Sequence, residues 1–240
     1  MTHKVIILAG GLGTRLSEET LMRPKPMVEI GGIPILLHIM RIFHSQVNCE
    51  FFVATGYKSE IIEKYLNSND FVREKIAATA IFTGDETATA GRIKKIMELY
   101  PGETFFMTYG DGVANIDIAD LLRFHQSHSK MATVTAVRPV ARYGRLQISD
   151  GLVTDFAEKS QTQEGWINGG FFVLNSEITG FINGYMEMFE QEPLSRLTGA
   201  SQLMAFEHSG FWQPMDTLRE KIDLDKLASS IKVPWMVHRT

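Results

Sequence analysis

A run of five apolar residues near the start of the chain, Val5 to Ala9, ends in a turn that carries three glycines. An uninterrupted apolar strand is typical of a parallel sheet, in which helices cover both faces. Glycines directly after the strand let the backbone turn tightly and point its N–H groups at an anion. This combination predicts an α/β fold with an anion-binding loop at the carboxyl end of the first strand.

Strand and helix patterns alternate through the first ~130 residues. Pro34 opens a helix in which Ile35, Ile39 and Phe43 recur at helical spacing. Further strands are predicted at 51–54, 77–82 and 104–108, and further helices at 59–66, around 93–100 and around 118–122. Alternation of this kind predicts a parallel sheet joined by right-handed crossovers.

The second part of the chain carries mostly strand patterns. Strands are predicted at 132–137, 145–148, 152–158 and 167–174, and helices at 193–197 and from Thr217 onward. Thr217 and Glu220 have the spacing of a capping box, which marks a helix start. We therefore expect one α/β domain over residues 1–240, with a Rossmann-like, mostly parallel sheet flanked by helices and a β-rich second half.

Composition excludes several classes of protein. The chain is 44% hydrophobic and 22% charged, as in ordinary globular proteins, and its net charge of -4 argues against a general nucleic-acid binder. Cys49 is the single cysteine, so an internal disulfide is impossible and a reducing, cytoplasmic setting is expected. No apolar segment approaches the roughly 20 residues that span a bilayer, so no membrane association is predicted.

Two cations follow the glycine turn. Arg15 lies two residues after Gly13, and Lys25 lies between Pro24 and Pro26, which stiffen the backbone around it. Leu16 replaces the last glycine of a dinucleotide fingerprint, and the Gly-Lys-Ser/Thr ending of a P-loop is absent. Arginine and lysine suit a polyphosphate, whereas the alternative is a flexible surface turn with two solvated cations.

Several motifs in this order resemble the sugar-phosphate nucleotidyltransferases, and among them the members that use CTP. The resemblance rests on 10–16 (GGLGTRL) and 24–29 (PKPMVE), with support from 108–112 (TYGDG), 167–173 (INGGFFV), 190–194 (EQEPL) and 211–217 (FWQPMDT). It implies the nucleotidyltransferase fold, with a nucleotide-binding half over 1–130 and an acceptor-binding half over 131–240.

The resemblance implies a Mg²⁺-dependent transfer of CMP from CTP to a phosphorylated acceptor, in the first place α-D-glucose 1-phosphate, giving CDP-glucose and pyrophosphate. Arg15 and Lys25 would be the catalytic cations, and Asp111 and Asp216 would hold the metal. Each aspartate alone is as readily a turn residue or a helix cap. Hard carboxylate oxygens completed by phosphates are what Mg²⁺ favours.

The same resemblance assigns the substrate contacts. The nucleotide would be bound by Leu8, Ala9, Gly10, Gly11, Gly13, Thr14, Thr87, Arg92 and Gly110. The acceptor would be bound by Gly144, Glu158, Lys159, Asn168 and Gly169. Ser160 stands where the family has proline, and Arg145 departs from the family pattern beside the acceptor. Side-chain identity leaves open which groups select cytosine.

Alternatives remain open at this point. The acceptor could be another sugar phosphate, or a small non-sugar phosphate or phosphoramidate used in surface polysaccharide modification. From another class, the chain could be an inactive nucleotide-sugar sensor, although it retains all four charged residues of the family site. The protein could form homo-oligomers, but one sequence does not reveal its oligomeric state. His125 and His128 have a spacing that would suit a metal, but a packed core position is favoured for His125.

Overall fold

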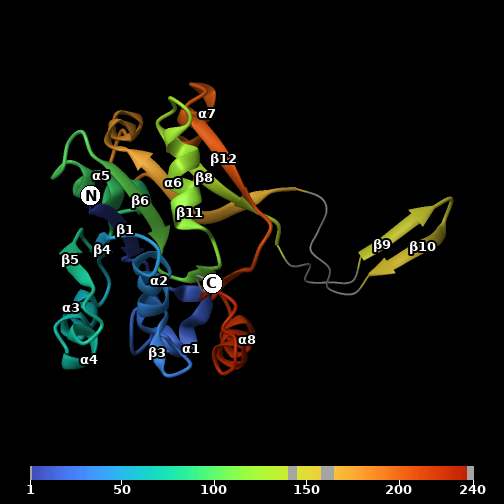
Figure 1. Cartoon of the computed structure of the whole chain (residues 1–240), viewed down its shortest axis with the longest axis horizontal. Coiled ribbons are helices and arrows are strands. Elements are labelled where there is room, and N and C mark those ends of the chain that lie inside the picture. Colours follow the sequence, from blue (N-terminus) through green and yellow to red (C-terminus); the bar gives the residue numbers. More distant parts are fainter. Residues whose placement is uncertain (1, 140–144, 158–164, 237–240) are drawn as a thin grey trace.

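The computed structural model describes residues 2–139, 145–157 and 165–236 (Figure 1). Its centre is a seven-stranded sheet in the order β12-β8-β11-β6-β1-β4-β5. These strands are β12 (Leu203–His208), β8 (Ala132–Val137), β11 (Ile167–Asn175), β6 (Thr104–Tyr109), β1 (His3–Ala9), β4 (Cys49–Thr55) and β5 (Ala77–Phe82). The sheet joins strands from both parts of the chain, as the expected α/β fold requires.

Strand direction places the loops that follow the strands along one edge. β1 pairs parallel with β4 and β6, β4 pairs parallel with β5, and β8 pairs parallel with β12. Only β11 runs the other way among the strands of this sheet, antiparallel to β6 and β8. The carboxyl ends of β1, β4, β5 and β6 therefore meet at the edge where ligands bind in open α/β sheets.

Helices cover both faces of the sheet. They are α1 (Ser17–Thr20), α2 (Ile35–His44), α3 (Ser59–Leu66), α4 (Asn69–Val72), α5 (Thr89–Met97), α6 (Ile118–Gln126), α7 (Glu192–Gly199) and α8 (Leu218–Ala228). Alternate residues of β1 enter two separate cores, because successive side chains of a strand point to opposite faces. Val5 and Ile7 pack with α2, α3, α6 and α8, whereas Ile6 and Leu8 pack with α5 and α7.

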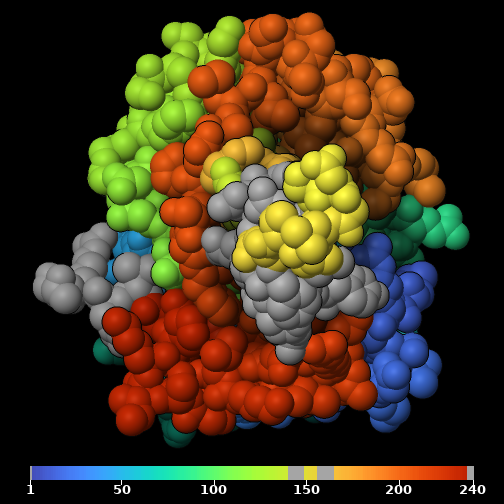
Figure 2. All heavy atoms as spheres, turned by 90° about the vertical axis from the view of Figure 1, so that its right-hand side faces the viewer, coloured from blue at the N-terminus to red at the C-terminus, as the bar shows by residue number. Residues whose placement is uncertain are grey.

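Short elements complete the fold. They are the pairs β2 (Glu29–Ile30) with β3 (Ile33–Pro34), β7 (Gly112–Ala114) with β13 (Trp212–Pro214) and β9 (Arg145–Ser149) with β10 (Leu152–Ala157), and the 3₁₀ helices Thr14–Leu16, Lys25–Met27 and Ser176–Phe181. The β9–β10 hairpin stands apart from the body in Figure 1. In Figure 2 it lies in front, between α8 (red) below and the orange segment that includes α7 above.

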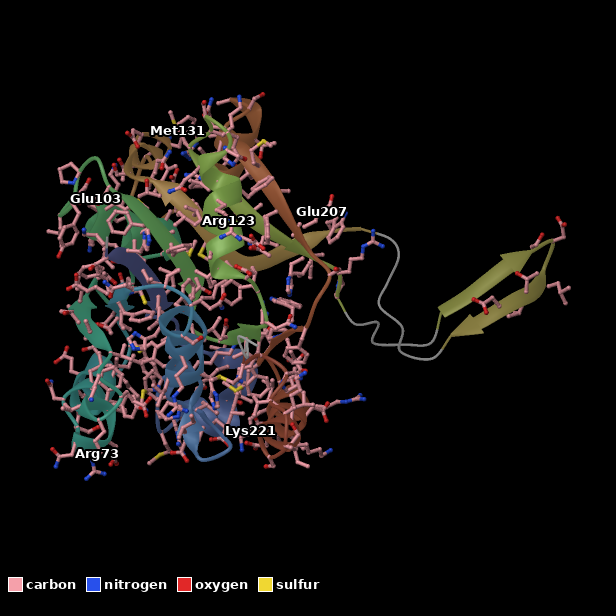
Figure 3. The ribbon with its side chains drawn as sticks, in the orientation of Figure 1. Arg73, Glu103, Arg123, Met131, Glu207 and Lys221 are labelled. Atoms are coloured by element: carbon pink, nitrogen blue, oxygen red, sulfur yellow. The ribbon has the colours of Figure 1, made fainter. Side chains whose placement is uncertain are left out.

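The predicted helix start at Thr217 is confirmed. The Thr217 hydroxyl accepts from the Glu220 N–H, and the Glu220 carboxylate accepts from the Thr217 N–H, so α8 begins with a complete capping box. Lys221, labelled in Figure 3, ties this helix to α1, with its Nζ 3.8 Å from a carboxylate oxygen of Glu19.

His125 packs in the core, as expected. It is buried. Its Nδ1 lies 2.9 Å from the Thr133 hydroxyl, and its Nε2 lies 3.1 Å from the side-chain oxygen Oδ1 of Asn175. The side-chain oxygen of Asn175 only accepts, so Nε2 carries the proton and Nδ1 accepts from Thr133. The Thr133 hydroxyl in turn accepts from His128, 2.9 Å away. The rings of His125 and His128 are thus both hydrogen-bonded within the protein.

Across the described ranges, no helix is long and apolar enough to cross a membrane.

Candidate active site

The glycine turn after β1 is held by its own backbone. Gly13 has a φ of 65°, a left-handed conformation that favours glycine, and its carbonyl accepts from the Leu16 N–H at 3.0 Å and from the Thr20 hydroxyl at 3.0 Å. A Cβ on Gly13 would also lie 2.7 Å from the Thr20 methyl group. The turn thereby leads into the 3₁₀ helix Thr14–Leu16, on which the Arg15 side chain is 78% exposed.

Lys25 stands at the centre of a charged cluster. Its Nζ lies 2.7 Å from Asp111 Oδ2 and 2.6 Å from Asp216 Oδ1. A guanidinium nitrogen of Arg15 lies 3.3 Å from the second oxygen of Asp216. We call Arg15, Lys25, Asp111 and Asp216 the charged cluster. Both predicted catalytic cations and both predicted metal ligands therefore lie together beside the turn after β1.

The two aspartates are far apart in the sequence, and a small antiparallel sheet joins them. β7 follows Asp111 directly, β13 precedes Asp216, and the two strands pair. The Met215 N–H donates to the Asp111 carbonyl at 2.8 Å, and the Asp216 N–H donates to the Glu220 carboxylate at 2.8 Å. The capping box of α8 thus helps to fix Asp216.

The pKa of Lys25 reflects this setting. Burial lowers the pKa of its ammonium, but the Asp111 charge and the hydrogen bonds to both aspartates outweigh burial and raise the pKa above its ordinary value. A raised lysine pKa keeps the ammonium charged throughout the neutral range. The cluster therefore keeps a charged ammonium between the Asp111 and Asp216 side chains at physiological pH.

The carboxylates of the charged cluster suit a divalent cation. Their oxygens converge on one cation, the Lys25 ammonium, from 2.7 and 2.6 Å. Mg²⁺ is commonly held by one or two carboxylates, with water and substrate phosphates completing its octahedron. Among the described residues no group of three or more metal-binding side chains gathers. The donor set thus fits a Mg²⁺ ion that arrives with phosphates.

A cavity of about 420 Å³ opens beside the charged cluster. Its wall contains all four residues of the cluster and every residue predicted to bind the nucleotide: Leu8, Ala9, Gly10, Gly11, Gly13, Thr14, Thr87, Arg92 and Gly110. Ala88, Thr89 and Met188 complete the part of the wall around the start of α5, with Thr87 and Arg92; we call this part the α5 wall. The cavity thus joins a charged region to a largely uncharged one.

Arg92 lines the cavity, but its guanidinium donates hydrogen bonds to other atoms of the protein. Its guanidinium donates to the carbonyls of Thr55, Gly10 and Asp85 at 2.8, 3.0 and 3.3 Å and to the Thr83 hydroxyl at 2.6 Å. Burial lowers its pKa. A Cβ on Gly10 would lie 2.1 Å from this guanidinium, so Gly10 leaves room for Arg92 itself. Arg92 holds together the ends of β1, β4 and β5.

Tyr109 connects the cavity to the predicted acceptor side. Its hydroxyl donates to Glu190 Oε1 at 2.6 Å, and Glu190 Oε2 accepts from the Thr89 hydroxyl at 2.8 Å. The Asn168 amide lies 3.4 Å from the same tyrosine oxygen. Burial raises the pKa of the Tyr109 phenol, and the Glu190 charge adds to that effect. Tyr109 therefore stays protonated.

The predicted acceptor residues are only partly visible. Gly144, Glu158 and Lys159 lie outside the described residues. Asn168 lines a second, neighbouring cavity of about 700 Å³, and the Gly169 carbonyl accepts from the indole N–H of Trp212 at 2.7 Å. Neither belongs to the wall of the first cavity. Of the two acceptor candidates that lie within the described residues, Asn168 is linked to the first cavity through Tyr109.

Sequence reasoning missed several residues of this site. Tyr109 and Pro26 were visible as members of quoted motifs, and Pro26 packs within 2.8 Å of where a Cβ on Gly110 would lie. Met188 carried no motif, because a methionine in a loop has no periodic or charge pattern. Thr89 lay within the stretch 83–92 that resembles the nucleotide-binding segment of the family, but only Thr87 and Arg92 were predicted there. Only the folded chain brings 188–190 onto the start of α5.

Comparison with known proteins identifies the family of this chain. The chain is 46% identical to "Glucose-1-phosphate cytidylyltransferase" of Salmonella typhi, over 97% of this chain and 98% of that protein. It is 37% identical to "Probable glucose-1-phosphate cytidylyltransferase" of Bacillus subtilis strain 168, over 98% and 99%. The crystal structure of HddC from Yersinia pseudotuberculosis superimposes with a TM-score of 0.74 at 26% identity, covering 94% of this chain and 99% of that one. Residues 4–213 match the nucleotidyl transferase family, and the chain belongs to that family.

Proposed function

We propose that this protein transfers CMP from CTP to a phosphorylated acceptor, with α-D-glucose 1-phosphate as the acceptor, and releases pyrophosphate. The observation that carries the proposal is the convergence of Arg15, Lys25, Asp111 and Asp216 at one side of a cavity after β1. The choice of CTP and glucose 1-phosphate as substrates is supported by the names of two relatives, which match nearly the whole chain at 46% and 37% identity.

The reaction joins two anions that repel one another. A phosphate oxygen of the acceptor attacks the α-phosphorus of CTP in line, and the bond from that phosphorus to the oxygen bridging to the β-phosphorus breaks. Pyrophosphate leaves with that oxygen and its electron pair. The protein needs no covalent intermediate, so catalysis comes from positioning and from stabilisation of charge.

The side chains of the charged cluster suit these tasks. Arg15 is mostly exposed and lies beside Asp216 in the cavity wall, where its guanidinium would bind the leaving pyrophosphate through paired N–H groups. Lys25 is held by carboxylates rather than by main-chain groups, so its ammonium can exchange one anionic partner for another. We assign Lys25 to the reacting phosphates.

Asp111 and Asp216 would hold the Mg²⁺ that accompanies the nucleotide. When bound, this ion neutralises phosphate charge and orients the triphosphate. The two aspartates lie at the same end of one small sheet, just before β7 and just after β13, and this placement holds their carboxylates near each other. The backbone N–H groups of the glycine turn would contribute further donors to the triphosphate.

A pyrophosphate-release assay tests this function. The chain is mixed with MgCl₂, CTP and one acceptor from a panel that contains glucose 1-phosphate, other sugar 1-phosphates and small non-sugar phosphates. Turnover with CTP and glucose 1-phosphate, abolished by chelation with EDTA, is the expected result. Turnover with CTP and only another acceptor would reject glucose 1-phosphate, and no turnover with any acceptor would reject the transferase.

A further inference from the structure

The α5 wall contains a hydroxyl group with a fixed direction. Thr87 Oγ1 lies 2.6 Å from the Thr83 carbonyl oxygen, which can only accept, so the Thr87 proton is committed to that carbonyl. Thr87 lines the cavity and is half-buried. Toward the cavity its oxygen can therefore present a lone pair and no proton.

Lys95, one helical turn and more beyond the start of α5, enforces this direction. Its Nζ lies 2.6 Å from the Thr83 carbonyl oxygen and 3.3 Å from Thr87 Oγ1. The ammonium also lies 4.9 Å from the centre of the Tyr185 ring, which holds it in place. A donor on this side prevents the Thr87 hydroxyl from turning its own proton toward Lys95.

Two glycines leave room for the threonine side chain. Gly84 has a φ of 106°, and a Cβ there would lie 2.7 Å from Thr87 Oγ1. On the other side, a Cβ on Gly91 would lie 2.8 Å from the Thr87 methyl group. Real Cβ atoms do not approach that closely, so glycine at both positions creates the space into which the Thr87 side chain fits. Both branches of the side chain thus occupy space that a larger residue at 84 or 91 would close.

The hydroxyl of Thr83 is also fixed by hydrogen bonds, but both its proton and its oxygen are bound within the protein. Thr83 Oγ1 donates to the Thr55 carbonyl at 2.7 Å and accepts from Arg92 at 2.6 Å. Thr83 is buried, whereas Thr87 is open to the cavity. Of these two hydroxyl groups, Thr87 therefore offers an acceptor to a ligand.

We infer that Thr87 selects cytosine over uracil by accepting a hydrogen bond from the exocyclic amino group, and that Lys95 is the positioning residue that keeps its lone pair turned toward the base. This inference rests on the proposed use of CTP. Cytosine carries an amino donor at the position where uracil carries a carbonyl acceptor. A uracil ring in the same pose would set two acceptors against each other, or would break the hydrogen bond from Thr87 to Thr83.

The experiment measures the affinity of the whole chain for CTP and for UTP by isothermal titration in the presence of MgCl₂. Thr87→Val keeps the shape of the side chain but removes the acceptor, and the ratio of CTP to UTP affinity should fall by about tenfold to a hundredfold. Thr87→Ser keeps the hydroxyl and should retain the wild-type ratio. Lys95→Met should lower the ratio in the same direction.

Lys94→Met is the matched control. Lys94 lies beside Lys95 on α5 and donates to a main-chain carbonyl, that of Ile182 at 2.8 Å, but has no contact with Thr87. This variant should keep the wild-type ratio. Binding of inorganic pyrophosphate should be the same in all variants, because the charged cluster is untouched, and it shows that each variant is folded.

The outcomes separate this inference from the proposed function. A wild type that prefers CTP, with Thr87→Val and Lys95→Met that keep the preference, would overturn the inference and leave the function standing. Loss of the preference in Thr87→Ser would also overturn it. A wild type that binds UTP as tightly as CTP would contradict both.

Discussion

The two parts of the cavity hold their cations in different ways. In the charged cluster, Lys25 is paired with two carboxylates and Arg15 is mostly exposed beside one of them. On the α5 wall, Arg92 donates to main-chain carbonyls and to the Thr83 hydroxyl, and Lys95, which does not line the cavity, donates to the Thr83 carbonyl and to Thr87 Oγ1. The side chains of the charged cluster can exchange their ion-pair partners for substrate phosphates or a metal. The hydrogen bonds from Arg92 and Lys95 to main-chain carbonyls cannot break without disturbing the fold. One part of the cavity is therefore arranged to exchange charged partners, and the other is arranged to keep its shape.

Removing one carboxylate of the charged cluster should have the largest effect. Asp111→Asn keeps the size of the side chain but removes a charge from the proposed metal site. Loss of one preorganised charge-stabilising group typically lowers kcat by about 10² to 10³, and we expect at least that in the pyrophosphate-release assay. The melting temperature should change little, because Asp111 is partly exposed.

Asp223→Asn is the control for that substitution. Asp223 lies on α8 and pairs with Lys226 at the surface, 3.6 Å away. It should retain wild-type turnover. Near-normal activity of Asp111→Asn beside an intact control would show that the metal is not held at the charged cluster.

On the α5 wall, the same kind of change should act on stability. Arg92→Met removes a donor from four oxygen acceptors: the Gly10 and Asp85 carbonyls and the Thr83 hydroxyl lose the bond from Arg92, and the Thr55 carbonyl keeps only its bonds from Thr83. Loss of these four hydrogen bonds should lower the free energy of unfolding by about 2–4 kcal/mol, measured by urea denaturation. Arg73→Met, at an exposed arginine labelled in Figure 3, should leave it unchanged. Equal stability of the two variants would contradict a structural role of Arg92.

Two adjacent glycines sharpen the comparison further. A Cβ on Gly10 would lie 2.1 Å from the Arg92 guanidinium, whereas a Cβ on Gly11 would meet no atom within 4 Å. Gly10→Ala should lower the free energy of unfolding by about 1–3 kcal/mol, because the added methyl displaces Arg92. Gly11→Ala should leave stability unchanged and weaken CTP binding, since its open side faces the cavity. Destabilisation by Gly11→Ala and not by Gly10→Ala would reverse the assignment.

The smallest expected effect is the change of the free energy of unfolding with pH. It concerns histidines in the core and not the residues that line the cavity. No histidine is among the described residues that line the cavity. Burial lowers the pKa of His125, partly offset by its hydrogen bond to Asn175. A folded-state pKa below the unfolded value of 6.5 means that the unfolded chain binds more protons in acid. The free energy of unfolding should therefore be steady above pH 6.5 and fall below it.

His125→Gln should flatten this acid-side decline, as measured by urea denaturation between pH 5 and 8. An undiminished decline in the variant would assign the effect to other groups. CTP affinity of the wild type should not follow the titration of His125, because the ring lies in the network of Thr133 and Asn175.

The sequence predicted the elements that have a period or a punctuating residue. The bounds of α3, β5 and β8 agree with the expected ranges 59–66, 77–82 and 132–137. The short strands β7 and β13, which join Asp111 to Asp216, were not predicted, because three residues carry no period. β12 was missed as well.

Within the site, the charged residues could be predicted and their partners could not. Arg15, Lys25, Asp111 and Asp216 stand in recognisable motifs, so their meeting was foreseeable. Lys95 and Arg92 act through main-chain carbonyls, which every residue has, and their partners therefore leave no trace in the sequence. The residues that fix shape become visible only once the chain is folded.

We propose that Asp111 and Asp216 together hold a divalent cation that binds with the nucleotide. Titration of Mn²⁺ into the protein in the presence of CTP, followed by electron paramagnetic resonance, measures this binding without turnover. A tightly bound Mn²⁺ is expected in the wild type and should be lost in both Asp111→Asn and Asp216→Asn. Undiminished Mn²⁺ binding in the two variants would show that these aspartates do not hold the cation.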